Sequence, residues 1–313
     1  MRTSDFMRLL LLSAIWGASF LFMRMIAPTL GALPTAFFRV LLGAIGLALI
    51  LMALHLRWNF KGKFRSTLIL GVINSGIPFL MYSIAARILP AGYSAILNAT
   101  TPLMGVILGA LLFSEKLTRS RVAGVLLGFA GVALLVDTGP VTATHHVLLG
   151  AGACLIATAC YGAAGFLTKR WISERGGLDS KLVAFGSQIG ATLCLFPFFA
   201  YSATTNPPAS WGGSELWAAI GALGLICTAL AYILYFRLIA DIGPIKSLTV
   251  TFLIPPFGVL WGFLFLNEPL SWSYLFSGGL IGLAVWMVLK KNDTDNFVKT
   301  AKLTSKLVQD LNP

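Results

Sequence analysis

The chain has 313 residues, of which 57% are hydrophobic and 11% charged, and its mean hydropathy is +0.85. A soluble globular domain carries about 25% charged residues, so this composition excludes a soluble globular protein. The formal net charge is +12. The basic residues nevertheless fall in short loops between apolar runs rather than along one stripe, which argues against a nucleic-acid-binding surface.

Ten apolar segments follow one another along the chain, each close to the roughly 20 residues that a membrane helix needs. We predict spans at 6–26, 33–54, 67–87, 91–113, 119–137, 147–168, 181–201, 216–238, 245–266 and 273–290. Turn signals separate them, for example Pro28 to Pro34 between the first two. The first span follows basic residues as a signal peptide would, but no small-residue cleavage site follows it. We therefore expect a retained helix.

The distribution of lysine and arginine predicts the orientation. With the N-terminus in the cytoplasm, 20 of the 23 basic residues fall in cytoplasmic loops and termini. The predicted outer loops without a basic residue are 138–146, 202–215 and 267–272. The positive-inside rule therefore predicts a multi-pass protein of the cell membrane (inner or plasma membrane) with both termini in the cytoplasm. We expect residues 291–313 to form a polar cytoplasmic tail.

The second half of the chain repeats the first. Pro102 and Glu115 recur 153 positions further on as Pro255 and Glu268. The same register pairs Tyr82 with Tyr235, Ser94 with Ser247, Gly105 with Gly258 and Gly109 with Gly262. Each half, 6–137 and 147–290, holds five spans, and an odd number makes the halves enter the membrane in opposite directions. We predict an all-α membrane protein whose ten transmembrane helices form two inverted five-helix repeats, as in many transporters.

Residues near mid-depth in these spans suggest a substrate site. Prolines in corresponding helices of two halves point to a transport site, or else they only improve packing. A buried amide without partners is costly, so polar residues should face the bundle interior, either bonding neighbouring helices or lining a cavity. Aromatic residues nearby either form a cavity wall or pack. The candidates are Trp16, Phe20, Arg39, Asn74, Tyr82, Asn98, Pro102, Tyr161, Gln188, Tyr232, Thr251 and Pro255.

Arg39 is the candidate with two opposed interpretations. It lies about six residues inside the second span, roughly 9 Å from the outer end at 1.5 Å per residue. A charge at that depth is costly. Its guanidinium either extends to the outer surface or neutralises a carboxylate or phosphate of the substrate.

Other features are read as structural. Glu115 and Glu268 precede helices and should stabilise the N-termini of those helices. Pairs of glycines four residues apart, such as Gly124 and Gly128 or Gly278 and Gly282, let helix backbones approach closely. The four cysteines lie in apolar runs and suit packing. The sequence contains no catalytic, cofactor-binding or metal-binding motif. We therefore expect no enzyme activity, no cofactor and no metal.

Together these features resemble the drug/metabolite transporter superfamily, specifically its EamA-type ten-helix members. The residues that carry the resemblance are Trp16-Gly17-Ala18-Ser19-Phe20, Arg39, Thr101-Pro102-Leu103, Glu115, Gly124, Gly128 and Gly131, then Tyr161-Gly162-Ala163, Pro255, Glu268, Gly278 and Gly282. The resemblance covers about residues 6–290. Ala184 stands near the place that Arg39 holds in the first half, so twin arginine sites are not expected.

The resemblance implies two inverted five-helix domains around a central cavity. It also implies export of amino acids or similar small metabolites by alternating access, often against a proton gradient, from within a lipid bilayer. Relatives of this superfamily exchange sugar- or phosphate-bearing metabolites, which is the alternative. A passive channel is a further alternative, but a channel should show a polar stripe along several spans, whereas the polar residues here concentrate near mid-depth.

Overall fold

The computed structural model of the protein describes residues 3–115, 117–243, 247 and 249–289, and these residues contain helices but no β-strand. The elements are α1 (Thr3–Leu30), α2 (Ala32–Ala53), α3 (Phe64–Gly71), η1 (Val72–Gly76), α4 (Ile77–Ala86), α5 (Ala91–Asn98), α6 (Thr101–Phe113), α7 (Arg119–Thr138), α8 (His145–Trp171), η2 (Ser173–Arg175), α9 (Ser180–Thr205), α10 (Ser214–Gly221), η3 (Ala222–Leu230), α11 (Ala231–Ile242), α13 (Val250–Leu266) and α14 (Trp272–Leu289).

The predicted all-α membrane architecture is confirmed. In the described part of the chain, nine helical segments are long and apolar enough to cross a membrane. The tenth predicted span, 245–266, corresponds to the shorter α13, and its first residues include positions outside the described ones. The segments η1 and η3 join their neighbours into continuous rods, so α3, η1 and α4 form one span and α10, η3 and α11 another.

The first two spans are connected differently from the prediction. The expected break from Pro28 to Pro34 is a single residue, Gly31, because α1 continues to Leu30 and α2 begins at Ala32. Gly31 has φ +88°, a conformation that glycine adopts without steric cost. Pro28 lies in the last turn of α1 and Pro34 in the first turn of α2, so the proline signals located the boundary but overestimated the length of the loop.

The two prolines predicted to interrupt helices behave differently. Before Pro102 the chain leaves the helix at residues 99 and 100, between α5 and α6, so this span is interrupted as expected. Pro255, in contrast, lies inside α13, which continues from Val250 to Leu266. Residue 249, just before α13, forms a turn and residue 248 lies outside the described residues, so a kink at Pro255 that matches the one at Pro102 stays a prediction.

Two π-helical segments occupy repeat-related positions. The segment η1 covers Val72–Gly76, and 153 residues later the corresponding stretch lies within η3, Ala222–Leu230. A π segment widens the helix and turns the residues beyond it, and such segments often occur at functional sites. Here they carry Ser75 and Thr228, which the repeat pairs. No sequence signal predicted them.

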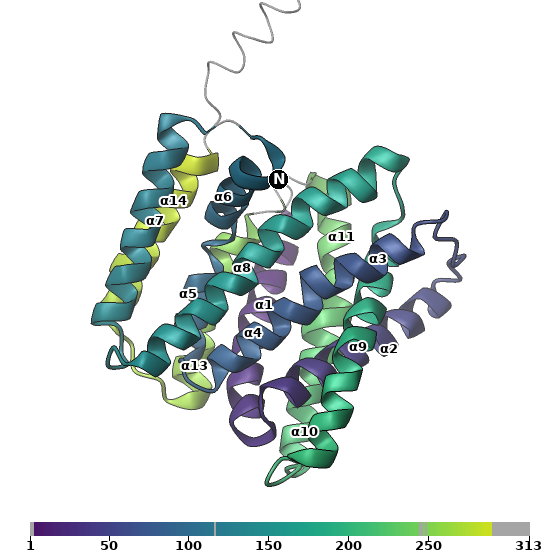
Figure 1. Ribbon diagram of the computed structural model, residues 1–313, viewed down its shortest axis with the longest axis horizontal. Coiled ribbons are helices and arrows are strands. Elements are labelled where there is room, and N and C mark those ends of the chain that lie inside the picture. The colour runs from purple at the N-terminus through teal and green to yellow at the C-terminus, as the bar shows by residue number, and fades with distance from the viewer. Residues whose placement is uncertain (1–2, 116, 244–246, 248, 290–313) are drawn as a thin grey trace, which may run out of the picture.

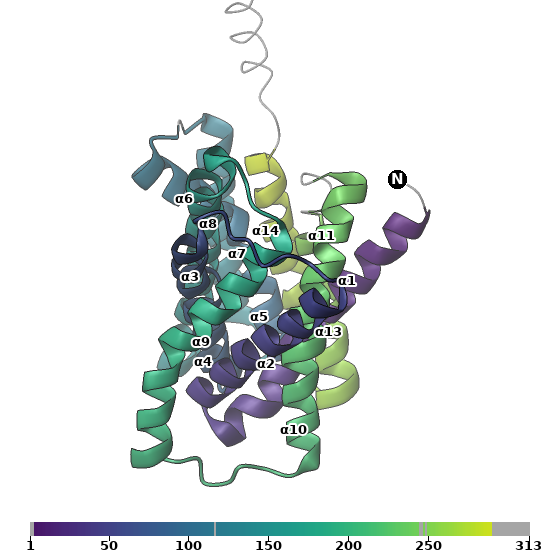
Figure 2. The same ribbon diagram turned by 90° about the vertical axis from the view of Figure 1, so that its right-hand side faces the viewer.

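Helices of the two halves pack against one another in corresponding pairs. The repeat counterparts α7 and α14 contact each other along one edge of the bundle (Figure 1), and α2 likewise contacts α9. In the centre α1 packs on α13, while its counterpart α8 packs on α5 and α6. The beginning of α1 and the end of α14 lie at one end of the bundle, here called the N-terminal face (Figure 2).

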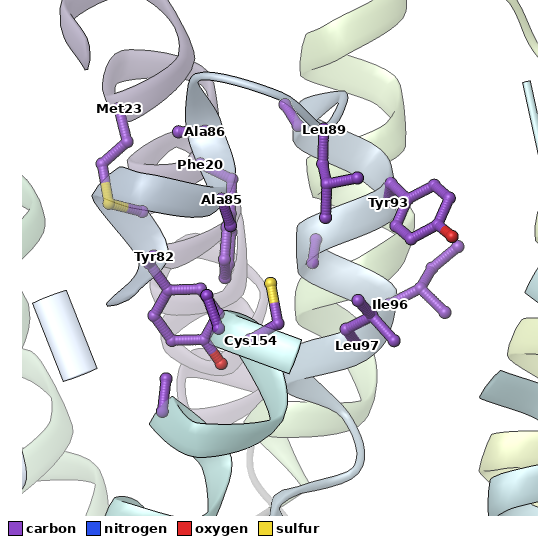
Figure 3. Packing of buried hydrophobic residues seen from close by; sticks show 14 of the residues in the cluster. Phe20, Met23, Tyr82, Ala85, Ala86, Leu89, Tyr93, Ile96, Leu97 and Cys154 are labelled. Atoms are coloured by element: carbon purple, nitrogen blue, oxygen red, sulfur yellow. The ribbon is translucent and has the colours of Figure 1, made fainter. Parts of the chain in front are cut away.

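A large apolar cluster fills the bundle toward the face opposite the N-terminal face. Most of its members come from the end of α1, from α4 and α5, from the end of α7 and from the beginnings of α8 and α10, and Figure 3 shows part of it. Residues of α14 extend the cluster as far as Val288, near the N-terminal face. Ile26, Leu89 and Tyr93 are completely buried there, and Ile220 is 1% exposed. Because these residues belong to both halves, the two halves are packed tightly together toward this face.

Candidate functional site

A cavity of about 270 Å³ lies between the two halves. Residues from α1, α2, η1, α4, α5, α6, α8, η3, α11 and α13 line it, so both repeats contribute. They are Trp16, Ser19, Phe20, Met23, Arg39, Asn74, Phe79, Tyr82, Asn98, Thr101, Tyr161, Cys227, Thr228, Tyr232, Tyr235, Val250, Thr251 and Ile254. A concave site of mixed aromatic and polar lining is the usual form of a small-molecule site.

Nine of the twelve residues predicted as a substrate site line this cavity. The three that do not are Pro102, Gln188 and Pro255. Each proline directly follows a lining residue, Thr101 or Ile254, so it shapes the backbone beside the cavity. Gln188 is completely buried in α9 outside the lining.

Gln188 bonds a neighbouring helix instead of facing the cavity. Its Nε2 donates a hydrogen bond of 2.9 Å to Ser75 Oγ in η1. This is the interhelical role that the sequence analysis left open for mid-span amides. Its Oε1 has no hydrogen-bond partner among the described residues.

Arg39 points into the bundle and is only 5% exposed, which rules out extension to the outer surface. Its Nε donates to Thr228 Oγ1 at 3.3 Å, and Nη1 lies 3.3 Å from Met23 Sδ. The guanidinium carbon lies 3.6 Å from the centre of the Phe79 ring, a favourable cation–π distance. Contacts from α1, α4 and η3 thus hold the guanidinium at the cavity wall.

The π segment explains the bond between Arg39 and Thr228. The Thr228 hydroxyl donates to Leu223 O at 2.9 Å, five residues earlier, a spacing that matches the wider helix. Its lone pairs are therefore directed toward Nε of Arg39. The local geometry of η3 thereby fixes the orientation of the guanidinium.

A second polar group lies where α5 meets α6. Pro102 has no N–H to bond the carbonyl of Asn98, and the Thr101 hydroxyl donates to that carbonyl at 2.7 Å instead. The Asn98 side chain accepts a hydrogen bond of 2.8 Å from the Tyr82 hydroxyl. The interruption therefore places Asn98, Thr101 and Tyr82 together at the cavity.

Aromatic side chains form much of the remaining wall. The rings of Trp16 and Tyr235 lie 5.2 Å apart, and Phe20 meets Tyr82 edge-on at 5.3 Å. Tyr82 and Tyr161 stack at 6.2 Å. These separations are those of favourable aromatic pairs, and the wall suits an apolar or aromatic part of a ligand.

The lining carries one formal charge, that of Arg39. Within the described ranges no carboxylate lies within ion-pairing distance of it, and the lining includes no aspartate or glutamate. No group of metal-ligating residues is found in the part of the chain that the structure describes. The cavity is therefore electropositive.

Comparison with known proteins matches the chain to the EamA-like transporter family over residues 6–137 and again over 148–290. The chain belongs to this family. A solved crystal structure matches with a TM-score of 0.62 at 18% identity, covering 92% of this chain and 98% of the other, which shows a shared fold.

Three relatives illustrate the range of this EamA-like family. A protein described as "Probable terminal-alkyne amino-acid exporter" from Streptantibioticus cattleyicolor is 25% identical over 64% of this chain, and the match covers 65% of its own length. Protein PecM of Dickeya dadantii is 25% identical over 83% of this chain and 84% of its own. An uncharacterized transporter of Archaeoglobus fulgidus is 26% identical over 91% and 96%.

Several lining residues of this EamA-like protein were not predicted. Met23 and Phe79 contact Arg39, but an isolated apolar residue in an apolar span gives no sequence signal. Cys227 and Val250 were missed for the same reason. Thr228 carried one usable signal, its repeat pairing with Ser75.

Glu268 has a different role from the one predicted. Its carboxylate accepts hydrogen bonds from the backbone N–H of Ala91, at 2.9 and 3.0 Å, and lies 3.9 Å from Arg24 Nε. It therefore caps α5 in the other half rather than the following α14. The prediction was wrong because sequence proximity does not show which helix N-terminus a loop residue reaches.

The helices that follow the two glutamates are capped by hydroxyls. Thr118 Oγ1 accepts from Arg121 N at 3.3 Å at the beginning of α7, and Ser271 Oγ accepts from Ser273 N at 3.2 Å before α14. Thr118 and Ser271 are themselves repeat partners. Glu115 lies 3.7 Å from Arg121 in the first turn of α7, so its contribution there is an exposed ion pair of small stabilising effect.

Proposed function

We propose that this EamA-family protein is a secondary active transporter that exports amino acids or similar small metabolites by alternating access. The observation that carries the proposal is the buried Arg39 guanidinium, which lines a cavity between the two repeats and has no acidic partner among the described residues. An unpaired buried charge is costly. A substrate carboxylate would neutralise it.

The cavity volume supports a small substrate. Pockets for drug-sized ligands span about 300–1,000 Å³, and this cavity measures about 270 Å³. A nucleotide sugar would not fit without a large opening, so the volume favours an amino acid over the exchange of large phosphorylated metabolites. A relative named as an amino-acid exporter supports the same choice.

The packing supports a cycle between two openings. Phe20, Met23, Tyr82, Cys227 and Ile254 belong both to the cavity lining and to the apolar cluster toward the face opposite the N-terminal face. That side of the cavity is therefore closed. The inverted repeat would allow rocking of the halves to close the other side in turn, and a proton gradient is the energy source that we propose.

Efflux from proteoliposomes tests the proposal. We expect vesicles containing the purified protein to release loaded amino acids faster than protein-free vesicles, and an imposed pH gradient to change the rate. A panel of amino acids and phosphorylated metabolites should show release of the former. Release of phosphorylated sugars alone would favour the exchanger, and release of every solute regardless of chemistry would favour a channel.

Cysteine accessibility tests the membrane orientation, which we propose to have both termini in the cytoplasm. In a variant without the four native cysteines, Ser210→Cys between α9 and α10 should react with an impermeant reagent added to intact cells. Asn59→Cys between α2 and α3 should react only after the membrane is opened, because the basic loops face inward. The reverse pattern would contradict the orientation.

A further inference from the structure

We infer that the cavity recognises its substrate by a carboxylate group and does not require an ammonium group, so that its ligand class is small organic acids with an apolar or aromatic remainder. The inference rests on the proposed transport function, because the bound acid is taken to be the transported substrate. It extends that function, because amino acids become one subset of the accepted acids.

The guanidinium of Arg39 offers a free edge to an anion. Phe79 covers one face of the group, Nε is bonded to Thr228 and Nη1 contacts Met23. Nη2 donates to none of the described residues. Two parallel N–H donors of an arginine match the two oxygens of a carboxylate, and such pairs are among the stronger hydrogen bonds in proteins. A carboxylate can therefore bind here while its carbon chain extends along the aromatic wall.

The cavity offers no corresponding group to an ammonium. Within the described ranges, every aspartate and glutamate lies outside the lining. Glu268 binds Ala91 N and Arg24, while Asp241 pairs with Arg8 and Arg237 near the N-terminal face. The aromatic rings could attract a cation, but Arg39 stands among them and repels it. An amino group should thus add little to binding.

This arrangement predicts rejection of simple amines. An amine that lacks a carboxylate would bring a second positive charge beside Arg39, with no compensating anion. We expect it to bind on the order of 100-fold more weakly than the matching acid, as two like charges in a partly desolvated site require. A neutral amide should also bind weakly, because it cannot neutralise Arg39.

The test compares four probes of one shape on the purified full-length protein. They are 3-phenylpropanoate, phenylalanine, 2-phenylethylamine and 3-phenylpropanamide, and the readout is the ligand-induced rise in melting temperature at equal concentration. A ligand that binds the folded protein stabilises it. We expect similar rises for the two carboxylates and none for the amine or the amide.

Two variants locate the effect. Arg39→Gln should abolish the rises produced by both acids, whereas Arg87→Gln should leave them unchanged, because Arg87 is exposed and lies outside the cavity lining. If Arg39→Gln does not fold, the comparison of the four probes on the unmodified protein still tests the inference. A rise with the amine equal to that with the acids would overturn the inference, as would a rise with phenylalanine alone or with no probe.

Transport is measured separately with the same acids. If 3-phenylpropanoate stabilises the protein but loaded proteoliposomes release neither this acid nor phenylalanine, then the transport proposal fails while the inference on ligand class stands. If vesicles release phenylalanine but 3-phenylpropanoate neither stabilises the protein nor competes with that release, then the inference fails while the transport proposal stands.

Discussion

Replacing Arg39 by alanine is expected to abolish transport while leaving the folded protein about as stable as before. Removing one partner of a buried, hydrogen-bonded charge pair costs about 2–5 kcal/mol of binding free energy. Since each 1.4 kcal/mol is tenfold, the loss of transport at low substrate concentration should be on the order of 30-fold or more.

Stability should respond differently from transport. In the protein without substrate, Arg39 is a buried charge without an acidic partner in the described part of the chain, and burying such a charge opposes folding. Thr228 also retains its bond to Leu223 O when the arginine is removed. The lost cation–π and van der Waals contacts with Phe79 and Met23 should therefore be offset, and the melting temperature in detergent should change little.

Arg39→Lys separates charge from shape. Lysine retains the positive charge but replaces the planar fork by a point charge, so transport should fall to a level between the wild type and Arg39→Ala. Arg87→Ala is the matched control outside the cavity and should transport normally. Full transport by Arg39→Ala would show that this residue does not bind substrate, and a large fall in melting temperature would show that it mainly holds the helices together.

The sequence predicted that Arg39 is a candidate site residue but did not predict the contacts that hold its side chain. Its depth in an apolar span identified it as a candidate, because a charge there is costly in any fold. Its direction could not be predicted, because the contacts that hold it come from Met23, Phe79 and Thr228 on three other segments. Those contacts exist only once the tertiary packing is known.

The backbone features divide in a similar way. Hydropathy located the spans because the bilayer requires long apolar helices, and Pro102 located an interruption because its ring removes a donor. The π segments η1 and η3 could not be predicted, since a wider helical turn with an additional residue depends on tertiary packing, here against α9 and α2. The same holds for the Glu268 carboxylate, whose partner Ala91 lies in the other half.

The glycine pairs were only partly predicted. Gly124 and Gly128 in α7 do face α14 closely, as their spacing suggested. Gly278 and Gly282 do not serve close packing, because a Cβ on either would meet no atom within 4 Å. The helices α3 and α9 instead lie very close together at Gly71 and Gly190. Neither glycine was predicted to serve close packing.

Alanine at Gly71 or Gly190 is accordingly expected to destabilise the protein strongly. A Cβ at Gly71 would overlap the carbonyl oxygen of Ser187, and a Cβ at Gly190 would overlap that of Leu68. Both obstacles are backbone atoms, which cannot turn aside as a side chain can. The helices α3 and α9 would have to separate, which would pull Gln188 away from Ser75.

Overpacking of this kind costs about 1–3 kcal/mol and occasionally more, and we expect each variant to reach the upper part of that range. The control is Gly165→Ala in α8, where a Cβ would meet no atom within 4 Å. That substitution should stabilise the helix by up to about 1 kcal/mol, because alanine is the better helix former. Melting temperatures in detergent measure all three. If Gly71→Ala and Gly190→Ala have the same melting temperature as Gly165→Ala, then α3 and α9 do not approach closely. The position of Gln188 and of the cavity wall beside it must then be revised.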